Sequence, residues 1–106
     1  MKIPKITNLQ SYVLGVLCSE SEISGKQLRG KLISAGCQKS SPAFYQLMSR
    51  LEEAGLVSGR YRTVSVRGNK VRERVYEITN GGRRVLQEVA DFGSALTGLL
   101  GVGKNS

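Results

Sequence analysis

The chain has no histidine and no tryptophan, only two cysteines and two prolines, and eight acidic residues against sixteen basic ones. Without histidine it lacks the side chain most often used for general acid–base catalysis and for metal binding. Cys18 and Cys37 are not at metal-ligand spacing and do not make a disulfide framework. No glycine motif for nucleotides and no cluster of carboxylates is present either. These absences predict a protein that is not an enzyme and that uses no metal or cofactor.

Long apolar runs are also missing. No segment approaches the roughly 20 apolar residues of a membrane span, and residues 1–5 lack the apolar run of a signal peptide. We therefore expect a cytoplasmic, reduced protein with no membrane partner. The 106 residues, 40% of them hydrophobic, are enough for one small core.

Positive charge, in contrast, is abundant and clustered. The net charge is +8, which favours a polyanionic partner because basic side chains attract phosphate and release its counterions. Composition alone would also suit a merely soluble basic protein. Residues 57–78, however, hold six Lys and Arg against two Glu, so half of the net charge lies on a fifth of the chain. Clustering of this kind is typical of nucleic-acid binding, whereas a solvated hairpin that only protects an edge strand is the alternative.

Two helices are predicted before the basic segment. The first begins near Thr7 or Asn8, either of which can cap it. The second opens at Ser24, which forms a capping box with Gln27, and it ends at Gly36. Their expected core residues are Leu9, Val13, Val16, Leu17, Cys18, Leu28, Leu32 and Ile33.

A third helix is predicted from Ser41, with Pro42 in its first helical position. Gly55 suits the left-handed residue that ends such a helix. Its two faces separate cleanly: an apolar one of Phe44, Leu47, Met48 and Leu51, and a polar one of Ala43, Gln46, Ser49, Arg50 and Glu53.

A basic hairpin should follow, because residues 57–66 and 71–78 are rich in β-branched and aromatic side chains. Gly68-Asn69 is a good two-residue turn. It would place Tyr61 opposite Tyr76 and Arg60 opposite Glu77.

The last predicted helix starts at the cap Thr79 and carries apolar residues at gaps of four and three, which is a heptad seam. That seam is wider than a three-helix core needs, so we expect a second copy of the chain to cover it. The predicted homodimer interface comprises Val85, Leu86, Val89, Phe92, Leu96 and Leu99.

The predicted order α-α-α-β-β-α is that of a winged helix-turn-helix, a mainly α fold with a small β-hairpin (α+β). Residues 1–78 would form the DNA-binding domain, with a recognition helix at about 41–54 and a basic wing at about 57–78. Residues 79–100 would form the dimerisation helix and residues 101–106 a flexible tail.

The candidate site follows from chemistry. A helix N-terminus favours phosphate, Gln and Arg can pair with adenine and guanine, and arginines at a hairpin tip can contact phosphates or a minor groove. An ordinary solvated helix face is the alternative for the third helix, and a core-rim position is the alternative for Tyr45. The DNA-binding candidates are Lys39, Ser40, Ser41, Tyr45, Gln46, Arg50, Arg62, Arg67, Lys70, Arg72 and Arg74.

Three stretches resemble the PadR-like family of bacterial transcriptional regulators. Residues 23–28 (ISGKQL) resemble the opening of the family's second helix, and residues 40–57 (SSPAFYQLMSRLEEAGLV) resemble its recognition helix. Residues 74–79 (RVYEIT), followed by Gly82-Arg83-Arg84, resemble its second wing strand and the entry to its last helix. The resemblance covers about residues 9–92.

This resemblance implies a homodimer that represses transcription. It also implies that repression is relieved when a small-molecule effector or another signal alters the dimer. It also implies that Ser40, Ser41, Ala43, Tyr45 and Gln46 lie at the DNA face. Two features depart from the family. The chain has no Trp, whereas some small members bind flat aromatic drugs between tryptophans, and Pro42 replaces a common glycine.

The leading hypothesis is thus a sequence-specific regulator that binds double-stranded DNA. A winged-helix module that binds an acidic protein partner is the alternative, since fold alone does not fix function. RNA binding has less support because no aromatic stacking platform is visible.

Overall fold

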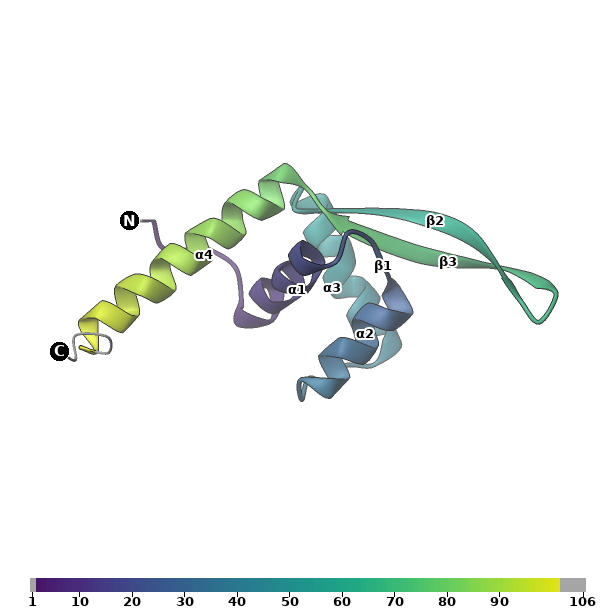
Figure 1. Cartoon of the computed structure of the whole chain (residues 1–106), viewed down its shortest axis with the longest axis horizontal. Coiled ribbons are helices and arrows are strands. Elements are labelled where there is room, and N and C mark those ends of the chain that lie inside the picture. Colours follow the sequence, from purple (N-terminus) through teal and green to yellow (C-terminus); the bar gives the residue numbers. More distant parts are fainter. Residues whose placement is uncertain (1, 102–106) are drawn as a thin grey trace.

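The structure is a computed structural model that describes residues 2–101. Three short helices form the body, and a long β-hairpin and a long helix leave it in opposite directions, which gives an elongated molecule of 60 × 26 × 23 Å (Figure 1). The elements in chain order are α1 (Asn8–Ser19), β1 (Ile23–Ser24), α2 (Gly25–Ser34), α3 (Ser41–Glu53), β2 (Val57–Val66), β3 (Asn69–Ile78) and α4 (Asn80–Leu99).

The polar residues that precede the helices act as their caps. Thr7 with Gln10 and Ser24 with Gln27 form reciprocal capping boxes on α1 and α2, which confirms both predicted starts. Thr79 Oγ1 accepts a hydrogen bond of 3.0 Å from the amide of Gly82 and caps α4.

One cap differs from the prediction. Ser40, and not Ser41, caps α3, because the Ser40 hydroxyl accepts from the amide of Ala43 at 3.3 Å. Pro42 consequently occupies the second helical position, where its missing N–H is still one of the unpaired first-turn donors.

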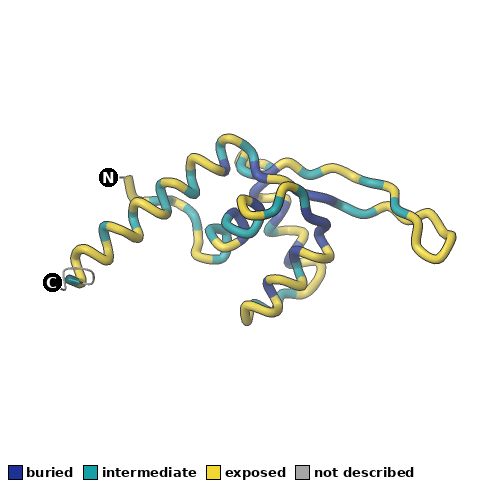
Figure 2. The backbone as a smooth tube through the Cα atoms, viewed as in Figure 1, coloured by how far each residue is buried: buried dark blue, intermediate teal, exposed yellow. Residues whose placement is uncertain are grey.

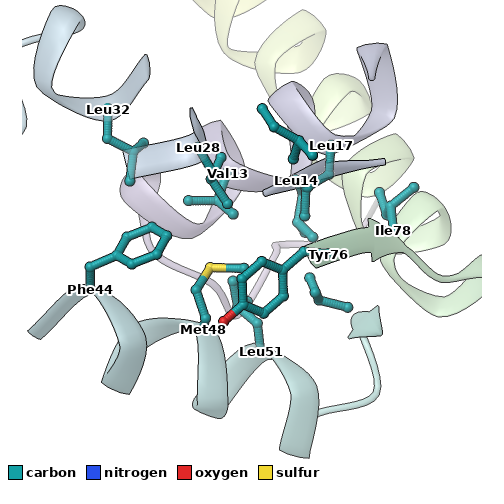
Figure 3. Close-up of a cluster of buried hydrophobic side chains, with 12 residues drawn as sticks. Val13, Leu14, Leu17, Leu28, Leu32, Phe44, Met48, Leu51, Tyr76 and Ile78 are labelled. Atoms are coloured by element: carbon teal, nitrogen blue, oxygen red, sulfur yellow. The ribbon is translucent and has the colours of Figure 1, made fainter. Parts of the chain in front are cut away.

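The core lies where the three helices meet the base of the hairpin (Figure 3). Phe44, Met48 and Leu51 of α3 point inward and are at most 1% exposed. Tyr76 of β3 lies beside Met48, so the base of the hairpin packs against α3. The remaining core residues are Val13, Leu14, Leu17, Ile23, Leu28, Leu32, Val57 and Ile78.

The sheet has three antiparallel strands in the order β1-β3-β2, whereas the sequence predicted only the hairpin. The two-residue β1 pairs Ile23 with Tyr76 and Ser24 with Val75. It was missed because it is too short to show an alternating pattern.

The hairpin register is also different from the prediction. The turn is Arg67-Gly68 rather than Gly68-Asn69, and both turn residues have positive φ (52° and 79°). Strand β3 therefore begins at Asn69 rather than Val71, Tyr61 lies opposite Arg74, and Arg60 lies opposite Val75. The shift is two residues, so each side chain keeps the face that was expected.

Three other side chains lie elsewhere than predicted. Cys18 is exposed rather than buried in the core, and its Sγ accepts from Arg83 Nη1 at 3.4 Å. Ile33 is 42% exposed, because the stripe that α2 buries is narrow and centred on Leu28 and Leu32. Arg60 forms its ion pair with Glu22 instead of Glu77.

Helix α4 divides into two parts. Near its start Val85 and Leu86 pack against the chain's own core. Toward its end Leu96, Leu99 and Leu100 are 43%, 83% and 78% exposed, and Figure 2 shows this half of the helix extending away from the body. The predicted tail falls, apart from Gly101, outside the described residues.

No helix within residues 2–101 is both long enough and apolar enough to cross a membrane. In the same part of the chain, no three His, Cys, Asp or Glu side chains come together in an arrangement that could hold a metal ion.

Candidate nucleic-acid interface

The outer face of α3 carries the predicted base-reading side chains. Because Phe44, Met48 and Leu51 fix the inner face in the core, Ser41, Gln46 and Arg50 are exposed on the outside. The first-turn amides of α3 and its dipole also favour an anion at that end.

The residues around the start of α3 also form hydrogen bonds within the protein. The carbonyl of Lys39 accepts hydrogen bonds from Arg29 Nε at 3.2 Å and from Arg29 Nη2 at 3.0 Å, which fixes the loop between α2 and α3. The Ser40 hydroxyl accepts from Ala43 as the cap, so its own hydrogen is still free to donate to a phosphate. Ala43 is half-buried.

Tyr45 lies at the rim of the core, as one of its two interpretations expects. Its ring packs edge-on against Phe44 with centroids 4.9 Å apart, yet 37% of the residue is exposed. It also covers the start of α2, because a Cβ on Gly25 would lie 2.8 Å from the Tyr45 hydroxyl. Tyr45 of α3 therefore makes a close contact with the start of α2.

The cations near the tip of the wing are exposed. Arg67, Lys70 and Arg72 form no ion pair with any residue of the described part of the chain. Arg72 stacks on Tyr61 with its Cζ 4.2 Å from the ring centroid, which orients the guanidinium without neutralising it.

The cations at the base of the wing, in contrast, are paired with carboxylates. Arg60 and Arg62 share Glu22, and Arg62 also donates to Glu73. The hydrogen bond that Arg62 donates to Glu73 raises the pKa of Arg62, with attraction from Glu73 and Glu22 acting in the same direction against desolvation. Arg74 Nη2 donates to Glu52 Oε1 at 2.6 Å. The sequence suggested a hairpin that is basic along its whole length. In the structure, carboxylates neutralise the arginines at its base, and the positive charge remains at its tip.

Helix α3 and the wing face each other across one groove of about 840 Å³. Ser49 and Tyr45 line it from α3, and Tyr61 and Arg72 line it from the wing. Lys26 of α2 also lines it, a cation that the sequence analysis did not select because nothing local separates it from the other charges of α2. Of the predicted site residues, Tyr45, Arg72 and Arg74 line this groove, whereas the others, Gln46 and Arg50 among them, do not.

A helix-turn-helix whose second helix exposes a polar face beside a β-hairpin defines the winged-helix class. Residues 13–88 match the family described as "Transcriptional regulator PadR-like family". Because the match spans most of the chain, the protein belongs to the PadR-like family of transcriptional regulators. This membership confirms the expectation of a regulator rather than an enzyme.

Solved structures agree with this assignment. A PadR family transcriptional regulator from Eggerthella lenta DSM 2243 is 26% identical, with a TM-score of 0.64 over 92% of this chain and 87% of that one. A PadR-like transcriptional regulator from Bacillus cereus is 22% identical, with a TM-score of 0.71 over 92% of each chain.

A third structure is PadR of Bacillus subtilis in complex with operator DNA. It is 21% identical, with a TM-score of 0.63 over 79% of this chain and 47% of that one. A search of curated protein sequences found no significant match.

Proposed function

We propose that this regulator binds double-stranded DNA, with the outer face of α3 reading bases and the wing tip holding phosphates. The observation that carries the proposal is that, within the described residues, the wing beside the exposed face of α3 ends in cations with no carboxylate partner, one of which, Arg72, lines the groove between the wing and α3. The operator complex of Bacillus subtilis PadR supports it, because that relative has the same fold.

Within this proposal the side chains divide by role. Gln46 and Arg50 are placed to contact base edges, while Arg67, Lys70 and Arg72 are placed to contact phosphates. Ser40 and Ser41 lie at the α3 N-terminus, where short hydroxyls and free amides suit a phosphate oxygen.

The proposal includes a homodimer that represses transcription until an effector alters it. The exposed leucines at the end of α4 support the dimer, because a large apolar strip in water is a typical interaction surface. A twofold dimer would present two α3 helices to two half-sites about one helical turn apart.

The test is a titration of a labelled random-sequence duplex by fluorescence anisotropy at several salt concentrations. Arg72→Ala should weaken binding to every sequence and reduce the slope of log K against log salt by about one unit, since one phosphate contact is lost. Arg84→Ala removes the same charge from the exposed side of α4 and should leave the slope unchanged. If the wild-type protein does not bind duplex DNA at micromolar concentration and low salt, DNA binding is rejected in favour of an acidic protein partner.

A further inference from the structure

Among residues 2–101, one ion pair joins α3 to the wing. Glu52 is in the last turn of α3 and Arg74 is in β3, and their contact of 2.6 Å links segments 22 residues apart. The two side chains are only 23% and 26% exposed. This contact is therefore better shielded from solvent than the Arg60–Glu22 pair at the wing base, where the arginine side chain is 57% exposed.

Space for this pair is provided by Gly59 in the adjacent strand β2. A Cβ at this position would overlap Glu52 Oε1 and would lie 2.9 Å from Arg74 Nη2. The φ of Gly59 is outside the left-handed region, so the backbone conformation does not require glycine. Glycine weakens a strand interior and commonly marks a close approach, and here the approaching group is the ion pair.

The pair is also connected to the exposed tip. The Arg74 guanidinium stacks on Tyr61 with Cζ 4.8 Å from the ring centroid, and Arg72 stacks on the same ring at 4.2 Å. The Tyr61 ring thus contacts both guanidinium groups. Burial opposes the charge on Arg74, but the attraction of Glu52 and the hydrogen bond that the guanidinium donates to Tyr76 raise its pKa overall.

We infer that Glu52, Arg74 and Gly59 form a bracket that sets the angle of the wing relative to α3, and that Arg74 is a positioning residue rather than a phosphate contact. The inference rests on the proposed DNA binding. Arg74, which the sequence predicted to contact DNA, would then not contact it. Glu52, although acidic, would favour DNA binding indirectly by holding the wing in place.

The physical reason is pre-organisation. A two-stranded ribbon that extends from a body bends easily about its base, and fixing it at the moment of binding has an entropic cost. The bracket fixes it beforehand. Simple electrostatics predicts the opposite effect for Glu52, since removing a negative charge from a DNA-facing groove should tighten binding.

Four single-residue variants separate these two accounts, with affinity for the same random duplex as the measurement. Glu52→Ala should weaken binding about three- to tenfold if the bracket pre-organises the wing. Glu53→Ala removes the same charge from the exposed neighbouring position, which forms no ion pair within the described residues, and should bind as tightly as wild type or more tightly. Gly59→Ala should reproduce the loss with no change of charge, whereas Ser58→Ala on the opposite face should not.

A fifth variant tests the role of Arg74. Arg74→Ala should lower affinity and leave the salt slope within half a unit of wild type, while a phosphate contact would reduce it by about one unit. The thermal unfolding of each variant is recorded first, and if Gly59→Ala does not fold, the Glu52→Ala and Glu53→Ala pair decides alone.

The possible failures are distinguishable. Tighter or unchanged binding by Glu52→Ala, or an Arg74→Ala slope equal to that of Arg72→Ala, would overturn the bracket while DNA binding stands. Absence of binding by the wild-type protein would overturn the proposed function itself.

Discussion

Gly82 determines how closely the start of α4 can approach the segment between α3 and β2. It is buried in the first turn of α4, and a Cβ there would overlap the carbonyl oxygen of Leu56 and lie 2.7 Å from Ile78 Cγ1. The neighbours are a backbone group and a core side chain, neither of which can move without disturbing the junction between β3 and α4.

We predict that Gly82→Ala lowers the free energy of unfolding by about 1–3 kcal/mol, as expected for overpacking. The control is Gly30→Ala in α2, where nothing lies within 4 Å of the new Cβ. That variant should raise the free energy of unfolding by about 0.5–1 kcal/mol because alanine is the better helix former. Denaturation in urea measures both changes, and a Gly82→Ala protein as stable as wild type would contradict the packing described.

At the residue scale, caps and core positions were predictable because their signals are local. Thr7 and Thr79 are residue types that cap helices, and Ser24 is read from Gln27 three residues away. The partners of the wing arginines were not predictable, since Glu22 and Arg60 are 38 residues apart and meet only because β1 joins the sheet. The prediction that Cys18 is buried was wrong. Cys18 follows the buried Leu17 in sequence, but the next position around a helix faces solvent.

The hairpin illustrates the same point at the element scale. Its existence followed from composition, but a two-residue shift in register leaves every side chain on its face, so the hydrophobic pattern could not choose between the two turns. The chosen turn places Arg67 at φ 52°, a conformation that side chains other than Gly, Asn and Asp rarely adopt. Backbone strain of this kind tends to occur at functional sites, and here it puts a guanidinium at the outermost point of the wing.

We predict that Arg67→Asn makes the protein more stable but weakens its binding to DNA. Asparagine tolerates positive φ and precedes Gly68 in the sequence favoured for this turn, so the free energy of unfolding should rise by up to about 1 kcal/mol. Affinity for duplex DNA should fall, with a salt slope smaller by about one unit. Chemical denaturation and the anisotropy titration are the two measurements, and a variant that is less stable than wild type or that binds with an unchanged slope would contradict this account of the tip.

At the scale of the whole molecule, the three helices hold two projecting elements with different chemistry. The wing ends in unpaired cations, and the opposite end of the molecule is the apolar half of α4 (Figures 1 and 2). The sequence predicted both, because a charge cluster and a heptad seam are properties of single segments. It could not show that Val85 and Leu86 pack on the chain's own core, whereas Leu96 and Leu99 stay exposed.

The central claim is that two copies of the chain, joined through α4, place α3 and the wing tip on one duplex. Hydroxyl-radical footprinting on a DNA site selected from a random pool tests it most directly. We predict two protected segments on one face of the duplex, with centres about 10 base pairs apart. A Leu96→Glu/Leu99→Glu protein should lose the paired pattern at the same concentration. A single continuous segment, or the same paired pattern from the double variant, would contradict the account.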